Sequence, residues 1–394
     1  MARGPRRRRD CAEVPHVSYI PLSVPNLSEL EAQHVNRALE SGFVSSVGPD
    51  VSSFEETFAR YVGAKYAVAC ASGTAALHVA LQVVGVTRER DVICADFTFA
   101  GSGNPIAYLG AQPVFVDSEW RTWNMDPQLV VEEIERRAAA GEPQPAAVEI
   151  VHVLGQPADA APILEVCARY GIPVVEDAAE SLGARWSSGV LAGRHTGTVG
   201  TIGCFSFNGN KIATTGGGGM VVTDDAELAA AVRHLTTQAK VPGVGYLHDV
   251  VGYNYRLTNL AAALGNAQLA RIDDFVAAKR RFAARYDQAF SDLPLVVPPR
   301  VEGFDSTYWL YSVLTADEME RDRLLEALDS AGIGARALWR PLHMQPAYGE
   351  PAHIGGHVGR ALFERGVSLP SSTGMTDEEQ DRVIAAVRDF FGAA

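Results

Sequence analysis

The segment FSFNGNKIATTGGGG, residues 205–219, joins two short apolar runs that are both typical of buried strands. It holds too many Gly, Asn and Thr residues to pack as a regular element, and four consecutive glycines at 216–219 let the backbone approach a ligand closely. Polar loops between strands are where α/β proteins place functional residues. Lys211 lies inside this loop and is one of only four lysines in the chain, so it is the leading candidate for a reactive amine.

The other three lysines have less informative surroundings. Lys65 precedes an apolar run, and Lys240 lies in a polar loop. Lys279 stands beside two arginines on a long amphipathic segment, where we expect a solvated helix face. On these positions alone, an ordinary surface location for Lys211 stays equally open.

Short β-branched runs alternate with helical segments on both sides of the loop, for example at 91–96, 112–117 and 172–177. This alternation predicts an α/β fold, with a mixed, mostly parallel sheet covered by helices on both faces. Near residue 259 the pattern changes to long helices and then to an α+β arrangement. We therefore expect a large domain over residues 19–265 and a smaller α+β C-terminal domain over residues 266–394.

The composition excludes several classes of protein. The chain has 394 residues and a net charge of −13 although its first ten residues carry five arginines, so the folded body is acidic and unsuited to binding nucleic acid. No apolar run is long enough for a membrane helix, so we expect no membrane partner. We interpret residues 1–18 as a disordered basic tail. Five unpaired cysteines indicate reduced thiols and a cytoplasmic location, with no metal site.

Four further features could hold a phosphorylated aromatic ligand. Ser72-Gly73-Thr74 follows a strand and opens a helix, whose N-terminus favours an anion, and Ser206 could add a second hydroxyl. Asp177 ends a strand and could pair with a protonated ring nitrogen. Phe99 could stack on a flat ring. Each feature alone is equally explained by a helix cap or by core packing.

Together these features match what pyridoxal phosphate requires. Lys211 would form the Schiff base and then shuttle protons, while Asp177 would keep the pyridine nitrogen protonated so that the ring accepts electrons. The sequence therefore predicts a pyridoxal-phosphate enzyme.

The motifs SGTAAL, VEDAAES, FSFNGNK-x4-GGGGM and GYNYR-x-TN resemble those of the DegT–StrS family of sugar aminotransferases, which are fold type I pyridoxal-phosphate enzymes. The resemblance covers about residues 20–390. It implies that Lys211 carries the internal aldimine and that Asp177 pairs with the pyridine nitrogen. It also implies that Gly73, Thr74 and Ser206 hold the phosphate. Glu180, at a position where the family often has Gln, is implied to lie near the ring's phenolic oxygen.

The same resemblance implies a homodimer with composite sites. The family's GxNxR segment, here Gly252–Arg256, reaches across a two-fold interface into the neighbouring site. Asn254 is expected to complete the partner's cofactor site, and Arg256 is expected to contact the partner's substrate. Family members that have become sugar 3-dehydratases carry His in place of the lysine, so Lys211 argues against that activity.

The segments HVLGQPAD and ARALWRPLHMQPAY are similar to those of the branch that aminates UDP-linked 4-keto-6-deoxy-N-acetylhexosamines with L-glutamate as donor, in a ping-pong reaction. Trp309, Trp339 and His343 are candidate substrate residues, because aromatic groups pack on a sugar or a nucleobase. Burial of both tryptophans between the domains stays an alternative.

Other functions stay open at this stage. A non-catalytic pyridoxal-phosphate-binding regulator would keep the cofactor motifs. An aminotransferase for a dTDP-3-ketosugar or a ketocyclitol of antibiotic biosynthesis would share all of them. A nucleotide-dependent oxidoreductase is disfavoured, because the glycines at 197, 200 and 203 do not have the GxGxxG spacing and precede a strand.

Overall fold

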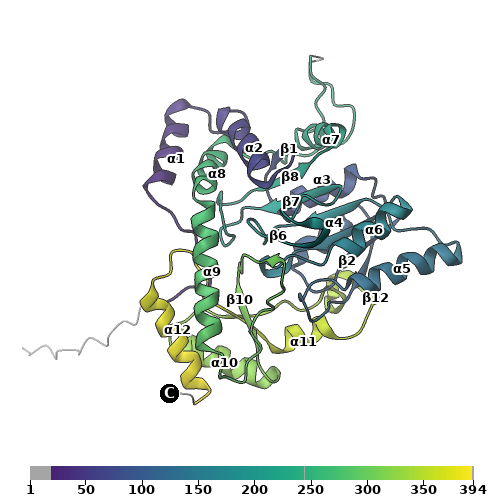
Figure 1. The fold of residues 1–394 in the computed structure, drawn as a ribbon. Coiled ribbons are helices and arrows are strands. Elements are labelled where there is room, and N and C mark those ends of the chain that lie inside the picture. Colours follow the sequence, from purple (N-terminus) through teal and green to yellow (C-terminus); the bar gives the residue numbers. More distant parts are fainter. Residues whose placement is uncertain (1–18, 244, 393–394) are drawn as a thin grey trace, which may run out of the picture.

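A computed structural model describes residues 19–243 and 245–392 of the chain. The predicted basic tail at residues 1–18, with Cys11, lies outside the described residues. Eight strands form the central sheet (Figure 1), in the spatial order β1 (Tyr66–Cys70), β8 (Gly219–Thr223), β7 (Ile202–Ser206), β5 (Val174–Asp177), β4 (Ala147–Val151), β2 (Asp91–Ala95), β3 (Gln112–Val116) and β12 (Ala352–Ile354).

Most neighbouring strands of this sheet are parallel, from β7 through to β12. Only β8 runs antiparallel to its two neighbours, β1 and β7. The Gly-rich loop at residues 207–218 is the connection between β7 and β8, so it leaves the sheet at the carboxyl end of β7. The mixed, mostly parallel sheet expected from the sequence is confirmed.

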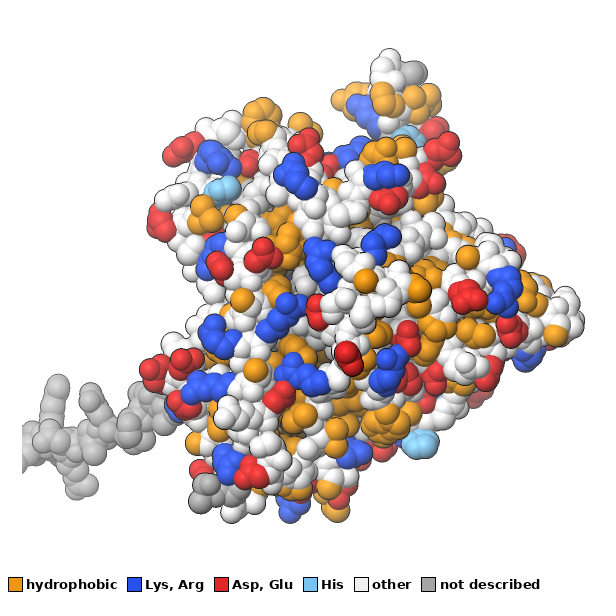
Figure 2. All heavy atoms as spheres, viewed as in Figure 1, with side chains coloured by type: hydrophobic (Ala, Val, Ile, Leu, Met, Phe, Trp, Pro, Cys, Tyr) orange, Lys and Arg blue, Asp and Glu red, His pale blue; other side chains and the backbone are white. Residues whose placement is uncertain are grey.

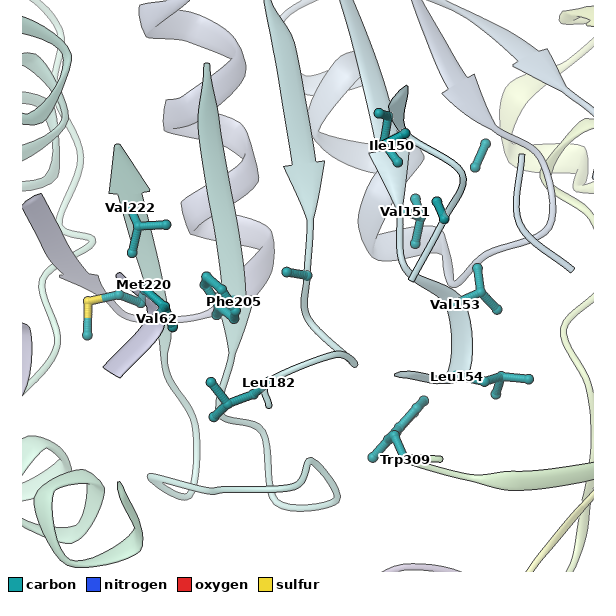
Figure 3. Packing of buried hydrophobic residues seen from close by; sticks show 14 of the residues in the cluster. Val62, Ile150, Val151, Val153, Leu154, Leu182, Phe205, Met220, Val222 and Trp309 are labelled. Carbon is teal, nitrogen blue, oxygen red and sulfur yellow. The ribbon is translucent and has the colours of Figure 1, made fainter. Parts of the chain in front are cut away.

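Helices cover both faces of the central sheet (Figure 1). One face packs against α3 (Gly73–Val83), α4 (Ala100–Tyr108) and α7 (Ala226–Thr236). The other face packs against α2 (Pro49–Val62), α5 (Pro127–Ala140), α6 (Ala161–Tyr170) and α8 (Asn259–Ala270). Apolar side chains of this second layer, among them Phe205 and Ile150, are drawn in Figure 3. The large buried area on both faces is the main stabilising contribution to the fold.

The C-terminal part has its own core around α9 (Ile272–Ala289). Its three-stranded antiparallel sheet has the order β10 (Tyr311–Leu314), β13 (Gly366–Leu369), β11 (Arg336–Ala337), and its other helices are α10 (Glu318–Ser330), α11 (Val358–Arg365) and α12 (Asp377–Phe390). β6 (Arg185–Trp186) and β9 (Phe304–Asp305) form a separate two-stranded antiparallel sheet. Short 3₁₀ helices occur at Val153–Gly155, Gly189–Leu191, Leu342–Met344 and Pro346–Tyr348.

Two elements that include residues of the expected C-terminal domain pack with the large domain. The boundary expected between residues 265 and 266 falls inside α8, which packs against α1 (Glu29–Ser41) and α2. Residues 352–354 return to the central sheet and add β12 beside β3. The central sheet is thus completed by a strand from the C-terminal part.

Local signals in the sequence were reliable at helix starts. The side chains of Ser28 and Glu31 form the expected capping box at α1, and Thr376 and Glu379 form another at α12. Within the described residues, Cys70, Cys94, Cys167 and Cys204 are free and buried. In the same part of the chain, no helix is long and apolar enough to cross a membrane.

The expectation of a solvated Lys279 is wrong. Its side chain is buried and its Nζ donates hydrogen bonds to the carbonyl oxygens of Trp309 and Ser371. Lys279 lies four residues after Phe275 and three before Phe282, both of which are buried on the same helix. Residues at that spacing share one helix face, so Lys279 belongs to the buried stripe despite its charged neighbours.

Candidate active site

A cavity of about 340 Å³ opens at the carboxyl ends of the central strands, between the sheet and the C-terminal part. Ten of the residues expected at the site line it: Ser72, Gly73, Thr74, Phe99, Asp177, Glu180, Ser206, Lys211, Trp309 and Trp339. They come from segments up to 267 residues apart in the chain. The fold therefore gathers one amine, two carboxyls, three hydroxyls and three aromatic rings around one space.

Lys211 stands between an acid and an indole ring. Its Nζ donates a hydrogen bond to Glu180 Oε1 at 3.2 Å and lies 3.9 Å from the centre of the Trp309 ring. The other carboxylate oxygen of Glu180 accepts the backbone N–H of Leu154 at 2.8 Å. Burial raises the pKa of Glu180, and the charge of Lys211 partly opposes that rise. Lys211 and Glu180 can therefore share or exchange a proton within the cavity.

The backbone around Lys211 is held in place by hydrogen bonds. The N–H of Lys211 donates to the carbonyl oxygen of Asn208, and the indole N–H of Trp309 donates to that of Asn210 at 2.7 Å. Because the loop closes on its own residues and on Trp309, the lysine is fixed near the ring. A Gly-rich loop is thus ordered by contacts from the C-terminal part.

Asp177 forms part of the cavity wall at the end of β5. Its Oδ2 accepts the hydroxyl of Ser102 at 2.8 Å, and its Oδ1 accepts the backbone N–H of Ala179 at 3.0 Å. The Ser102 hydroxyl also lies 2.9 Å from that of Thr98. These hydrogen bonds hold the Asp177 carboxyl in place at the cavity wall, where it can bind a cationic group.

The start of α3 forms a close-packed anion site. A Cβ atom on Gly73 would lie 2.8 Å from the Cβ of Ser206, and one on Gly219 would lie 2.4 Å from the carbonyl oxygen of Ser72. Only glycine fits at either position. Gly73 and Thr74 at the helix start line the cavity together with Ser206, and the N-terminus of a helix favours an anion. The Ser72 hydroxyl is the N-cap, because it accepts the N–H of Ala75 at 3.0 Å.

Phe99 lies at the edge of the cavity with 58% of its surface exposed. It follows Thr98, whose hydroxyl lies 2.9 Å from that of Ser102. An exposed phenyl ring beside a cavity is available to stack on a flat ligand.

Three expected residues do not line the cavity of their own chain. Arg256 Nη1 donates hydrogen bonds to Glu55 Oε1 at 2.8 Å and to the carbonyl oxygen of Ala69 at 3.3 Å. The guanidinium is therefore paired with an acid of the large domain in its own chain. Asn254 is exposed beside Thr237. His343 is not among the residues that line the cavity, and its Nδ1 lies 2.6 Å from Asp96 Oδ2. Its expected contact with substrate stays a prediction.

Asp96, His343 and His353 form a cluster behind Phe97, with candidate ligand atoms within 4.8 Å of one another. The two imidazole rings are stacked, with centres 4.0 Å apart and planes inclined by 28°. Asp96 raises the pKa of His353 by hydrogen bonding, against the effect of burial. Lone pairs lie in the ring planes, so two stacked imidazoles share a carboxylate more easily than they converge on one metal ion.

The sequence analysis missed Arg336. It lies on β11, is exposed, and lines the cavity without a hydrogen bond or ion pair to any described residue. Lys211 is the only other cationic residue in the cavity lining. No motif marks Arg336 in the sequence, since a lone arginine on a two-residue strand has no distinctive spacing. Ser102, which supports Asp177, was missed for the same reason.

Comparison with known proteins yields close matches over nearly the whole chain. A model of the DegT/DnrJ/EryC1/StrS aminotransferase family matches residues 25–388. EpsN of Bacillus subtilis, to which a pyridoxal-phosphate-dependent aminotransferase activity is ascribed, is 42% identical over 379 residues, covering 94% of this chain and 96% of EpsN. The GDP-perosamine synthase of Caulobacter vibrioides is 38% identical over 380 residues, covering 95% and 98%.

The similarity extends to solved structures. DesV of S. venezuelae, determined in complex with a ketimine intermediate, matches with a TM-score of 0.84 at 32% identity. The match covers 95% of this chain and 100% of DesV. An aminotransferase of Brucella abortus from the same family matches with a TM-score of 0.86 at 31% identity, covering 92% and 96%.

Proposed function

The chain belongs to the DegT/DnrJ/EryC1/StrS aminotransferase family, and on that premise we propose that it moves an amino group from L-glutamate to the keto carbon of a nucleotide-linked ketosugar. It is a pyridoxal-phosphate-dependent sugar aminotransferase. The observation that carries the proposal is the placement of Lys211, Asp177 and the start of α3 around one cavity. Both half-reactions would use this cavity in turn, as in a ping-pong mechanism.

The cavity fits three of the polar parts of pyridoxal phosphate. The glycine-walled start of α3 with Ser206 suits the phosphate, because a Cβ at Gly73 would close that space. Asp177 suits the protonated ring nitrogen, and Lys211 supplies the amine for the aldehyde carbon. When bound, the cofactor supplies an electron sink for the substrate's reacting carbon.

We assign the movement of the substrate proton to Lys211 Nζ. The amine has an acid beside it in Glu180, which can accept a hydrogen bond from it or return a proton to it. Trp309 covers the amine from one side at 3.9 Å and excludes water there. Lys211 is thereby restricted to the side of the cavity where Glu180 lies.

Arg336 and Trp339 are the candidate contacts for the nucleotide sugar. Arg336 presents an unpaired guanidinium at the cavity, and guanidinium groups bind the oxygens of phosphates in a bidentate manner. The indole rings of Trp309 and Trp339 are stacked, with centres 6.2 Å apart and planes inclined by 11°. A sugar ring can pack against the exposed part of Trp339, while Trp309 is buried.

The identity of the sugar is the finer part of this proposal. UDP-4-keto-6-deoxy-N-acetylhexosamine is the substrate that the sequence motifs favour, with transfer to carbon 4. The relatives named GDP-perosamine synthases favour a GDP-linked sugar as the second candidate.

A panel of UDP-, GDP- and dTDP-linked ketosugars, each incubated with the enzyme and L-glutamate, tests the proposal. Mass spectrometry gives the product mass, and NMR gives the position of the new amine. Amination of one ketosugar in the panel would support a nucleotide-linked sugar as the substrate and would identify its nucleotide. If glutamate converts the cofactor but no nucleotide sugar is aminated, the assignment to nucleotide sugars fails while the aminotransferase chemistry stands.

We also propose that two chains form the functional unit. The segment between α7 and α8 projects from the body of the molecule (Figure 1), and hydrophobic side chains lie on this projection (Figure 2). Tyr246, Leu247, Val250 and Val251 of this segment are exposed. A projecting apolar segment of this kind is suited to cover a second copy. Asn254, exposed at the base of the segment, is the residue best placed to reach a partner's site, whereas Arg256 would first have to leave Glu55.

Mixed dimers test this arrangement. Co-expression of Lys211→Ala chains with Asn254→Ala chains gives dimers in which one site has an intact lysine from one chain and an intact Asn254 from the other. Recovery of activity in purified mixed dimers supports action in trans. Failure to recover shows that Asn254 serves its own chain or no site. A cytoplasmic location stays a prediction.

A further inference from the structure

Glu149 is a buried acid that nothing in the proposed reaction uses. It lies in the middle of β4, is fully buried, and neither of its carboxylate oxygens has a hydrogen-bond partner among the described residues. A buried polar group without a partner is rare, because it loses its hydration and gains nothing in return. Its presence in the central strand of the sheet therefore calls for an explanation.

The register of the sheet shows what surrounds Glu149. Cys94 on β2 and Val175 on β5 lie directly beside it, and both belong to the apolar layer beneath α3 and α4. The groups that interact with it electrostatically are Asp177, the thiols of Cys94 and Cys204, and the Tyr348 hydroxyl. Those groups come from β5, β2, β7 and the C-terminal part. None of them is a cation, so nothing in this layer neutralises a charge on Glu149.

Of these groups, Asp177 is the one that has a role in the proposed reaction. It lies two residues beyond Val175 on the same strand, so its side chain leaves the sheet on the same face as that of Glu149. Strand spacing places the two residues about 8 Å apart. Burial and the charge of Asp177 both raise the pKa of Glu149 well above that of an ordinary carboxyl. Without a cation in this layer, both effects favour the protonated form of Glu149.

A cation beside Asp177 changes the balance between the protonated and the ionised form of Glu149. The protonated ring nitrogen of the cofactor, which the proposed function assigns to Asp177, brings a positive charge into the same low-dielectric region. That charge offsets Asp177 and lowers the cost of ionising Glu149. Linkage is reciprocal, so an ionised Glu149 also favours the protonated ring.

We propose that Glu149 is a positioning residue for the cofactor, an acid behind Asp177 that releases its proton when the protonated ring binds and then helps to hold that ring. The O–H bond of its carboxyl breaks and the proton passes to solvent, so the change is a simple ionisation. The inference rests on the proposed pairing of Asp177 with the ring nitrogen. It adds a second acid, behind Asp177, to the groups that would hold the protonated ring nitrogen.

Calorimetric titration of apoprotein with pyridoxal phosphate tests the inference without measuring turnover. Titration in buffers of different ionisation enthalpy gives the number of protons released on binding. Wild type is expected to release more protons than Glu149→Gln between pH 7 and pH 9, and to bind the cofactor roughly ten-fold more tightly at the alkaline end. At acid pH, where Glu149 stays protonated, the two affinities should agree.

Three further variants separate this role from a structural one. Glu149→Leu should raise the melting temperature, because it removes an unpaired polar group, and should show the same reduced proton release as Glu149→Gln. Val175→Ala alters packing in the same layer but removes no acid, so it should lower the melting temperature and keep wild-type proton release. In Asp177→Asn, the substitution Glu149→Gln should make no further difference to proton release.

Equal proton release and equal affinity in wild type, Glu149→Gln and Glu149→Leu would overturn the role of Glu149. A water molecule that bridges Glu149 would give that result. Failure of the wild-type protein to bind pyridoxal phosphate at all would instead overturn the assignment of the site. The two failures are therefore distinguishable in one experiment.

Discussion

Two lysines contact Trp309, and their surroundings differ. Lys211, on the loop after β7, has its Nζ 3.9 Å from the centre of the indole ring and 3.2 Å from Glu180 Oε1. Lys279, on α9, donates to the carbonyl oxygen of Trp309 at 2.7 Å and to that of Ser371. Burial lowers the pKa of Lys279 to about 7, which would suit a nucleophile, yet Lys279 does not line the cavity that Lys211 lines.

The difference shows what makes a lysine reactive in this fold. Burial alone lowers the pKa of Lys279, and this lysine lies outside the lining of the active-site cavity. Lys211 has a cavity on one side and an acid that can change its charge on another. Access and a titratable neighbour, more than burial, separate the reactive amine from the structural one.

The largest expected effect comes from removing the reactive amine. Lys211→Ala should lower the rate of transamination by roughly 10⁴-fold or more, because no other amine can bond to the cofactor and move the substrate proton. Borohydride reduction of the wild-type enzyme followed by peptide mass mapping should place the reduced cofactor on Lys211. A cofactor adduct on Lys279 would show that Lys279, and not Lys211, is the reactive amine. An adduct on Lys65 or Lys240 would show that neither lysine beside Trp309 is reactive.

Removing the structural amine should affect stability and leave chemistry intact. Lys279→Met leaves the buried carbonyl oxygens of Trp309 and Ser371 without donors, so the free energy of unfolding should fall by about 2–4 kcal/mol. Urea denaturation followed by circular dichroism measures the change. Arg281→Met, an exposed basic residue two positions along the same helix, is the matched control and should cost less than about 0.5 kcal/mol. Loss of cofactor attachment in folded Lys279→Met would contradict a purely structural role.

The stability that Lys279 contributes should also depend on pH. Its pKa is about 7 in the folded chain, against an ordinary value of 10.5, so between these values the unfolded chain binds more protons. The free energy of unfolding of wild type relative to Lys279→Met should therefore rise with pH, by about 2 kcal/mol between pH 7 and pH 9. The neutral amine has two N–H bonds for its two carbonyl acceptors, which agrees with that direction. If the difference in free energy of unfolding between wild type and Lys279→Met becomes smaller as the pH rises, the buried amine is charged.

The same two lysines show how far the sequence alone could go. Lys211 was identified because its loop combines a strand end, a polar run and four glycines, all of which are local signals. The strand and helix pattern likewise predicted the α/β sheet, since it depends on periodicity within each segment. Lys279 was misassigned because its charged neighbours outweighed the spacing that places it between two buried phenylalanines.

Contacts between distant segments could not be predicted from the sequence. The return of β12 to the central sheet, the ion pair of Arg256 with Glu55, and the approach of Arg336 to the cavity each join segments without a shared motif. Glu149 is a further example, since an isolated acid in an apolar run does not indicate which strand will lie beside it. Such features follow from the order of strands in the sheet, which periodicity within one segment does not determine.

The smallest expected effect concerns the acid that distinguishes Lys211 from Lys279. Glu180→Gln keeps the size of the side chain and an oxygen that can accept a hydrogen bond, but it cannot change its charge. The value of kcat should fall by less than about ten-fold, because Lys211 and the cavity remain. Glu180→Ala should cost more, because it also leaves the buried N–H of Leu154 without its acceptor.

The pH profile gives the sharper readout for Glu180. Burial raises the pKa of this carboxyl, so in wild type it takes up a proton at a higher pH than an ordinary glutamate and its ion pair with Lys211 is then lost. Wild-type activity should accordingly decline as the pH falls through that range, and Glu180→Gln should lack this part of the decline. An unchanged acid limb in Glu180→Gln would mean that the charge of Glu180 does not control Lys211. The two lysines would then differ only in their access to the cavity.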